Sequence, residues 1–265
     1  MKFGPNPHDP SLFAGTASYY SRYRFPYPQP LFDYLIRIYG FDGTGMALDL
    51  GCGPGLLTLP LASSFSKMVA MDPDEGMIDE ARRAANIAGL SNIEFVKGSS
   101  WELSPVMGEF RFVIMGQSFH WMERDQVLSI LYDMLEPEGG VAIVNQERRT
   151  PAAITNAEDE TVKKFLGDRR RAGRGYYEHP PEGHEAILAR SKFAVLSPWH
   201  YSYQRAQTVD EAVGLVFSTS RATRQLLGDR AVEFEAELRR RFMEAAPGGT
   251  FKLDVDVTAL LGHKG

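Results

Sequence analysis

The chain has 265 residues, 43% of them hydrophobic and 24% charged, which is ordinary for a soluble globular protein. Its formal net charge of -5 excludes a broad attraction to phosphate backbones, so nucleic acid is not an expected partner. The one cysteine, Cys52, cannot form an internal disulfide. Neither a signal peptide nor a run of roughly 20 apolar residues is found, so a cytoplasmic protein without membrane spans is expected.

Apolar patterning in chain order predicts strands that alternate with helices. A helical period after Pro30 ends at Gly40, and short apolar strands are expected at 46–50, 67–72, 93–98, 110–116 and 141–146. Nearly continuous apolar strands separated by helices indicate a parallel sheet covered on both faces. Two further strands near 192–206 and 250–260 would complete a mostly parallel, seven-stranded, doubly wound α/β sheet of Rossmann-like type.

The same pattern predicts four regions along the chain. Residues 1–40 form a helical lead-in or lid, and 41–150 form the ligand-binding core. Residues 151–250 form a helical cap at the carboxyl ends of the strands, which includes the strand near 192–206, and 251–265 hold the last strand. Loops and caps over a rigid sheet usually carry specificity, so the cap is expected to select the substrate.

The sequence LDLGCGPG follows the first predicted strand and opens a helix. Gly51, Gly53 and Gly55 permit a sharp turn and a close approach of the backbone to a ligand. A dinucleotide fingerprint would place its third small residue at the position of Leu56, so the spacing disfavours NAD. Asp49 stands two residues before the first glycine.

Asp72 closes the second predicted strand, about 20 residues after the glycine loop. An acid at this place can accept hydrogen bonds from both hydroxyls of a ribose. The alternative is an ordinary helix N-cap before Pro73.

LDLGCGPG and MDPDEGMIDEAR resemble the first two motifs of the class I S-adenosylmethionine-dependent methyltransferases, and the resemblance covers roughly residues 15–150. It implies S-adenosylmethionine as cofactor, with the glycine loop under its methionine part. It also implies that Asp72 holds the ribose and that Met77 packs on the adenine.

The family usually has Gly-Asp-Ala after the third strand, where this chain has Gly98-Ser99-Ser100-Trp101. Ser99 therefore replaces the acid that commonly binds the adenine amino group, and a hydroxyl or backbone group would substitute for it. Ser100 and Trp101 are further candidates for the cofactor site. The alternative for Trp101 is a place in the core.

The N-terminal sequence YYSRYRFPYPQPLFDYL resembles the lead-in of a small-molecule branch (methyltransferase type 11), which includes trans-aconitate methyltransferase-like and antibiotic-tailoring enzymes. The resemblance implies that Tyr20 and Arg24 lie near the amino-acid end of the cofactor. Packing of the first helix on the sheet edge is the alternative for both residues.

QSFHWM, residues 117–122, follows the fourth predicted strand. Within the resemblance, Gln117 approaches the methionine part of the cofactor and His120 faces the acceptor. Histidine suits a general base because its ordinary pKa is near 6.5. The alternative is that His120 and Trp121 pack under the next helix. No His/Cys/Asp cluster has zinc spacing, so no metal is expected.

These observations favour methyl transfer to an oxygen, or to a nitrogen or carbon, of a small metabolite or natural product, with His120 as base. A carboxylate acceptor would need an arginine clamp and no base, and the candidates are Arg22, Arg24, Arg205 and Arg221. A non-catalytic S-adenosylmethionine-binding protein is a third possibility, and methylation of RNA is disfavoured by the acidic balance. The sequence leaves monomer and homo-oligomer undecided.

Overall fold

The computed structural model describes residues 12–172, 175–177 and 180–265, which divide into two compact units. The sheet unit comprises residues 26–146, 180–201 and 257–265. The helical unit comprises residues up to Phe25 together with 147–179 and 202–256. The chain passes from one unit to the other within strands β5, β9 and β10, so each unit is described by itself.

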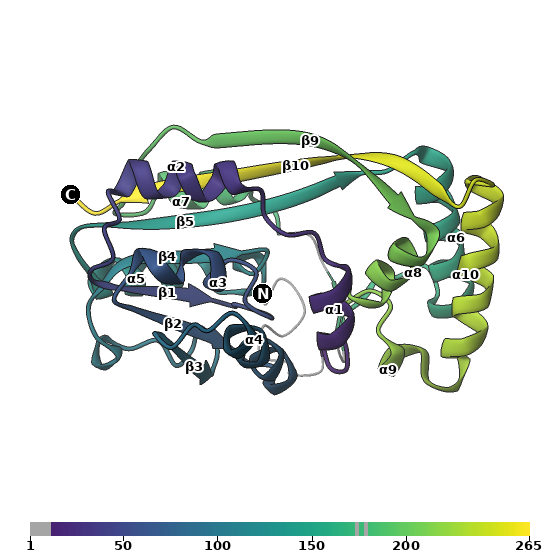
Figure 1. Ribbon diagram of the computed structural model, residues 1–265, viewed down its shortest axis with the longest axis horizontal. Coiled ribbons are helices and arrows are strands. Elements are labelled where there is room, and N and C mark those ends of the chain that lie inside the picture. The colour runs from purple at the N-terminus through teal and green to yellow at the C-terminus, as the bar shows by residue number, and fades with distance from the viewer. Residues whose placement is uncertain (1–11, 173–174, 178–179) are drawn as a thin grey trace. The chain divides into compact units, whose positions relative to one another are not determined.

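A single sheet organises the sheet unit, with strand order β3-β2-β1-β4-β5-β10-β8 and with β9 also paired to β10 (Figure 1). Strands β1 to β5 pair in parallel, whereas β8 is antiparallel to β10. This order confirms the doubly wound α/β fold. The strands are β1 (Met46–Leu50), β2 (Lys67–Asp72), β3 (Ile93–Lys97), β4 (Phe110–Gly116), β5 (Leu135–Arg149), β8 (Ala194–Val195), β9 (Trp199–Thr208) and β10 (Thr250–His263).

The strand expected near 192–206 is interrupted, which raises the sheet to eight strands. Strand β8 ends at Val195 and β9 begins at Trp199, with Pro198 between them. Proline has no N–H to donate to a sheet, so the pairing stops there and restarts after it. The prediction of one continuous strand was therefore wrong.

Helices cover both faces of this sheet. Helix α5 (Arg124–Met134) and α7 (His184–Ala189) pack on the face that carries Val113, in a cluster with Leu131 and Leu188. The neighbouring residue Phe112 points to the opposite face, where it meets Tyr39 of α2 (Gln29–Tyr39) at 4.9 Å between ring centres. Helix α4 (Glu75–Ile87) packs against strands β2 and β3, and the short α3 (Thr58–Leu61) follows the glycine loop.

Strand β5 begins at Leu135, six residues earlier than the predicted strand at 141–146. Pro137, Gly139 and Gly140 are poor helix formers, so the helix ends at Met134 and the backbone extends at once. Gly140 also lies under the ring of Tyr39, where an added Cβ would come within 2.1 Å of a ring carbon.

Helices dominate the helical unit. Helices α6 and α10 pack together, and Phe234 of α10 contacts Phe165 and Phe217 at 5.4 and 5.7 Å between ring centres. Helix α6 lies in the stretch that the sequence pattern left without a helix. The elements are α1 (Ala17–Tyr23), α6 (Ala152–Leu166), β6 (Arg171–Ala172), β7 (Gly175–Tyr176), α8 (Val209–Phe217), α9 (Arg224–Leu227) and α10 (Ala231–Ala245).

Candidate functional site

The glycine loop turns sharply at the carboxyl end of β1. Gly51, Gly53 and Gly55 have positive φ angles of 76°, 53° and 87°, in the left-handed region that favours glycine. At Gly51 an added Cβ would also lie 2.5 Å from Cβ of Ser118. The Ser118 hydroxyl donates to the carbonyl of Leu50 at 2.7 Å, so the loop is fixed against the segment that follows β4.

Asp72 ends strand β2 and receives two backbone hydrogen bonds. Its Oδ2 accepts from Gly53 N and its Oδ1 from Asp74 N, both at 2.9 Å. Burial raises the pKa of Asp72 to about 6, against the lowering effect of these two bonds. A carboxylate oxygen has two lone pairs, so each oxygen keeps capacity for one ribose hydroxyl. The alternative of Asp72 as N-cap of α4 is wrong, because Asp74 caps that helix by accepting from Met77 N.

Asp49 lies inside β1, with 1% of its surface exposed. Its Oδ2 accepts a 2.6 Å hydrogen bond from the Thr58 hydroxyl, whereas its Oδ1 is buried without a hydrogen-bond partner among the described residues. Burial is the main cause that raises the pKa of Asp49 to about 7, and the neighbouring charge of Asp72 adds to it. An orphaned buried acceptor is costly unless a donor reaches it.

These features fit the expected cofactor. Asp49 and Asp72 lie near the carboxyl ends of neighbouring strands and offer acceptor capacity to hydroxyl and ammonium donors. A pyrophosphate next to two buried carboxylates would be repelled, since burial strengthens like-charge interactions. The residues present therefore suit S-adenosylmethionine better than a dinucleotide.

Two of the residues expected at the adenine differ in exposure. Met77 is 3% exposed and Trp101 is 53% exposed, so the alternative that placed Trp101 in the core is wrong. Ser99 and Ser100 follow β3 and are half-buried. Both Ser99 donors, its N–H and its hydroxyl, bind the carboxylate of Glu102.

Gln117 begins the segment after β4 in a strained conformation. Its φ of 55° lies in the left-handed region, which costs of order 1 kcal/mol for a residue with a side chain. Its N–H donates to Val144 at 2.9 Å, and its side-chain amide donates to the carbonyl of Gln146. Strand β5 thus fixes Gln117 from two sides, while its approach to the methionine part stays a prediction.

His120 lies in the short 3-10 helix η3 (Phe119–Trp121), beside His184 at the start of α7. The two imidazole rings are 6.4 Å apart between centres, with 20° between their planes. Nη1 of Arg124 lies 3.3 Å from Nδ1 of His184. Because a guanidinium only donates, this nitrogen accepts and the proton of His184 sits on Nε2. Burial, and then the charge of Arg124, lowers the pKa of His184 to about 4.

Sequence reasoning missed His184 as a site residue. It stands 64 positions after His120 (184 − 120), and no spacing or motif connects the two. The fold brings them together because α7 returns to the same face of the sheet as the helix that follows His120. Glu102 was missed as well, although its position three residues after Ser99 was available as a signal.

Tyr20 and Arg24 belong to the helical unit, so their predicted role at the cofactor stays a prediction. The guanidinium of Arg24 lies 4.6 Å from the centre of the Tyr20 ring and donates to the carbonyl of Ser218 at 3.2 Å. Its Nε is buried without a hydrogen-bond partner in the described structure. Arg24 is thus held at the end of α1 with one donor unused.

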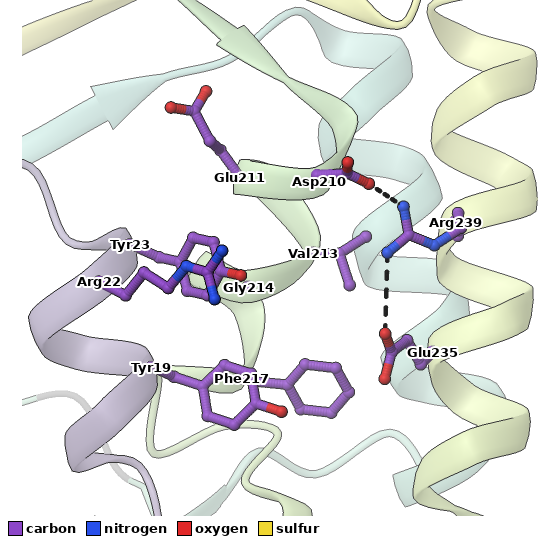
Figure 2. A pocket seen from close by; sticks show the side chains of 10 residues that line it. All are labelled: Tyr19, Arg22, Tyr23, Asp210, Glu211, Val213, Gly214, Phe217, Glu235 and Arg239. Carbon is purple, nitrogen blue, oxygen red and sulfur yellow. Dashed lines mark hydrogen bonds and ion pairs between the residues drawn. The ribbon is translucent and has the colours of Figure 1, made fainter.

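A pocket of about 520 Å³ lies within the helical unit (Figure 2). Arg239 on one wall is paired with Asp210 and with Glu235, the latter at 3.7 Å. Arg22 on the opposite wall lies 5.2 Å from the centre of the Tyr23 ring and has no acidic partner among the described residues. The lining residues are Tyr19, Arg22, Tyr23, Asp210, Glu211, Val213, Gly214, Phe217, Glu235 and Arg239.

The structure separates the four arginine candidates for a carboxylate clamp. Arg221 pairs with Asp159 at 2.7 Å, and Arg205 lies 3.5 Å from Glu211. Arg22 and Arg24 have no acidic partner among the described residues, and of these two Arg22 is the one that lines the pocket.

Neither a metal-binding cluster nor a membrane-spanning helix occurs among the described residues. Within residues 12–172, 175–177 and 180–265, His, Cys, Asp and Glu side chains nowhere gather in threes as a possible metal site. In the same part of the chain, every helix is too short or too polar to cross a membrane.

The known proteins that this chain resembles are described as methyltransferases. A family model described as a methyltransferase domain matches residues 47–139. An uncharacterized methyltransferase-like protein of Schizosaccharomyces pombe is 25% identical over 222 residues, covering 80% of this chain and 78% of that protein. The ubiquinone biosynthesis O-methyltransferase of Azorhizobium caulinodans is 32% identical over 126 residues, covering 44% of this chain and 49% of the relative.

A solved structure described as a type II methyltransferase from Anaeromyxobacter dehalogenans superimposes with a TM-score of 0.60. The match covers 91% of this chain and 97% of that one, at 22% identity. At this identity the likeness concerns the fold. It agrees with the parallel sheet and its glycine loop.

Proposed function

We propose that this chain, which belongs to the class I S-adenosylmethionine-dependent methyltransferases, methylates an oxygen of a small metabolite or natural product. The observation that carries the proposal is the pair of imidazoles, His120 and His184, which follow the carboxyl end of β4 next to the strand β1 that carries Asp49. One end of this edge suits the cofactor, and the other supplies a base.

We assign the cofactor to the glycine loop and the two buried carboxylates. Asp72 would accept the ribose hydroxyls with the lone pairs that Gly53 and Asp74 leave open. Asp49, through its unpartnered Oδ1, would accept a hydrogen bond from the ammonium group, directly or through water. S-adenosylmethionine, when bound, supplies a methyl group activated on a positively charged sulfur.

The protein's task at the other end is to hold the acceptor and remove its proton. An alcohol or phenol is a poor nucleophile until its hydroxyl proton leaves, and an unprotonated ring nitrogen of His120 would take that proton. Most of the acceleration in such a displacement comes from positioning. Trp121, whose ring centre lies 4.7 Å from that of His120, would supply aromatic surface for an apolar acceptor, whereas Phe119 is buried in the core below them.

Other features support a small acceptor and a cytoplasmic location. The relative from Azorhizobium caulinodans, which matches 44% of this chain, is an O-methyltransferase by name. The net charge of -5 argues against RNA, and the single buried Cys52 suits a cytoplasmic protein.

A carboxylate acceptor is the second candidate, and Arg22 favours it. Among the residues that line the pocket in Figure 2, Arg22 is the cation without an acidic partner in the described structure, and its guanidinium lies 5.2 Å from the centre of the Tyr23 ring. A carboxylate is already anionic, so methylating it requires an arginine and no base.

An acceptor panel on three variants tests the proposal. Phenols, alcohols, amines and carboxylic acids are incubated with S-adenosylmethionine, and formation of S-adenosylhomocysteine is measured. We expect a hydroxyl acceptor, and a decrease in kcat of about 10²–10⁴-fold in His120→Ala without loss of cofactor affinity. His200→Ala, on exposed β9, is the control.

Two results would contradict the proposed function. Full activity of His120→Ala on a carboxylic acid, lost in Arg22→Gln, would establish the second candidate. Tight cofactor binding without turnover of any acceptor would instead indicate a binding protein.

A further inference from the structure

The pocket in Figure 2 is formed by three helices of the helical unit, α1, α8 and α10. Helix α1 lies close to α8 because the ring of Tyr23 rests on Gly214, where an added Cβ would come within 2.4 Å of a ring carbon. Glycine inside a helix costs about 1 kcal/mol relative to alanine, so this close contact is made at the expense of α8. The volume of about 520 Å³ is typical of pockets that hold small molecules.

Every acidic side chain that lines the pocket is already engaged by an arginine. The three acids are Asp210, Glu211 and Glu235, and the arginines that pair with them are Arg205, Arg224 and Arg239. With Arg22 the arginines exceed the acids by one. A cationic ligand would have to displace one of these arginines, whereas an anionic ligand would meet a positive charge that is not yet neutralised.

Three hydrogen-bond donors at the pocket have no acceptor among the described residues. Arg22 makes no ion pair there, and its guanidinium lies in front of the Tyr23 ring (Figure 2). The Tyr19 hydroxyl accepts from Nε of Arg224 at 2.6 Å, so its own proton is left to donate. The Tyr23 hydroxyl likewise takes part in no hydrogen bond within the described structure. A carboxylate accepts several such bonds at once.

Apolar side chains complete the wall of the pocket. The Tyr19 ring lies 6.1 Å from the Tyr23 ring, with 25° between their planes, and 5.3 Å from the Phe217 ring. Val213 and Phe217 are buried and also line the pocket. A flat apolar body packs well against such rings while polar groups at its edge meet the donors.

This pocket lies on a different face of α1 from Tyr20 and Arg24. Tyr19 and Tyr23 are four residues apart and share a face, and Tyr20 and Arg24 follow each of them by one position, about 100° around the helix. All ten residues that line the pocket belong to the helical unit, whereas the glycine loop and His120 belong to the sheet unit.

We propose that this pocket binds a small carboxylate with a flat apolar body, at a site separate from those of the cofactor and the methyl acceptor. Arg22 and the Tyr23 hydroxyl hold the carboxylate, and Tyr19 and Phe217 contact the body. The inference rests on the proposed function, in which the acceptor is a hydroxyl beside His120. Under the second candidate, the same arginine would hold the acceptor itself.

Benzoate is the ligand for the test, and benzamide, which has the same shape and no charge, is its matched control. Ligand-observed NMR titrations of the wild-type protein should show that benzoate binds about tenfold or more tightly than benzamide, since hydrogen bonds to charged groups are the stronger ones. Benzoate should bind equally well when S-adenosylhomocysteine is present at saturation. Equal affinities for the two ligands, or displacement of benzoate by S-adenosylhomocysteine, would overturn the inference.

Three variants assign the binding to the pocket. Arg22→Gln should weaken benzoate about tenfold and leave benzamide unchanged, and Tyr23→Phe should weaken benzoate a few-fold. Arg37→Gln is the matched control, because Arg37 also lies over a tyrosine ring, 5.4 Å from the centre of Tyr34, without an acidic partner among the described residues. Equal benzoate affinities of Arg22→Gln and Arg37→Gln would overturn the inference.

The fate of bound benzoate separates this site from a site for the acceptor. Benzoate incubated with the protein and S-adenosylmethionine should stay unmethylated, as mass spectrometry would show. Formation of methyl benzoate, lost in Arg22→Gln, would overturn the separate site and establish the carboxylate acceptor. Absence of turnover with every hydroxyl acceptor, while benzoate still binds, would contradict the proposed function alone. The two failures are therefore distinguishable.

Discussion

The carboxyl ends of β1 and β2 differ in construction from the carboxyl end of β4, although all three lie along one edge of the sheet. The first two are held by backbone groups and buried carboxylates, with Asp72 binding Gly53 N and Asp74 N. The end of β4 is held by side chains, with His120 beside His184 and Arg124 beside His184.

This difference teaches how one scaffold can keep a fixed cofactor and change its acceptor. Backbone hydrogen bonds and positive φ angles leave little freedom to the segment between β1 and β2, so it suits one invariant ligand. Side chains from separate helices can be exchanged singly without disturbing the sheet. We therefore expect substitutions at the carboxyl ends of β1 and β2 to change the affinity for the cofactor. Substitutions at the carboxyl end of β4 should change the turnover of the acceptor.

The largest expected effect follows from removing the ribose acid. Asp72→Ala should weaken S-adenosylhomocysteine more than 100-fold, because hydrogen bonds to a charged group contribute about 1.5–3 kcal/mol each. Asp79→Ala, which breaks only the exposed pair with Arg82, should leave the affinity unchanged. Equal affinities of the two variants in a calorimetric titration would remove Asp72 from the site.

Gly51→Ala tests the contact between the glycine loop after β1 and Ser118 after β4. The new Cβ would lie 2.5 Å from Ser118 at a φ of 76°, so we expect a loss of about 2–3 kcal/mol in the free energy of unfolding. Gly89 has a similar φ of 70° but open space around it, so Gly89→Ala should cost only about 1 kcal/mol. Denaturant titration measures both, and equal losses would mean that Ser118 does not constrain the loop.

Cofactor affinity should depend on pH, because two acids with raised pKa values lie at the carboxyl ends of β1 and β2. Burial raises the pKa of Asp72 to about 6 and that of Asp49 to about 7, and ligand donors favour the ionised forms. Affinity for S-adenosylhomocysteine should therefore fall by about tenfold or more between pH 7 and pH 5, as Asp72 and Asp49 gain protons. Asp72→Asn should remove the part of this dependence that comes from Asp72, in titrations at pH 5, 6 and 7. A wild-type affinity independent of pH would contradict the assignment.

The same shifts act in the opposite direction on the stability of the free protein. Both acids have a higher pKa in the folded protein than in the unfolded chain. Their contribution to the free energy of unfolding is therefore at its maximum below about pH 4. It is lost as pH rises through about 6 and 7. Bound cofactor should reverse this trend, which thermal unfolding with and without S-adenosylhomocysteine would detect.

The smallest expected effect concerns the second histidine. His184→Ala removes the neutral ring beside His120 and the acceptor of the Arg124 bond. We expect acceptor turnover to fall a few-fold, with the affinity for S-adenosylhomocysteine unchanged. A change in cofactor affinity without a change in turnover would mean that the β4 end serves the cofactor.

The contrast between the two ends also explains what the sequence could predict. The parallel sheet, the glycine loop and the neighbouring acids depend on local patterns, and the structure confirms the doubly wound fold. Asp49 and Asp72 lie near the carboxyl ends of adjacent strands, so their closeness follows from the topology alone. Pro198 could have indicated the interruption between β8 and β9, since a proline in a predicted strand argues against continuity.

The β4 end could not be predicted in the same way. His184 reaches His120 only because α7 packs on the α5 face of the sheet, and a single sequence carries no signal of that packing. The helical unit was similarly hard to predict, since α6 mixes apolar and charged residues without a motif. The family model matches residues 47–139, which all belong to the sheet unit.

The most direct test of the central claim is a calorimetric titration of the wild-type protein with S-adenosylhomocysteine and, separately, with NAD. The buried acids and the glycine loop predict micromolar binding of S-adenosylhomocysteine at one site per chain and no binding of NAD. Binding of NAD, or of neither ligand, would contradict the assignment of the β1–β2 end and remove the basis for a methyl acceptor beside His120.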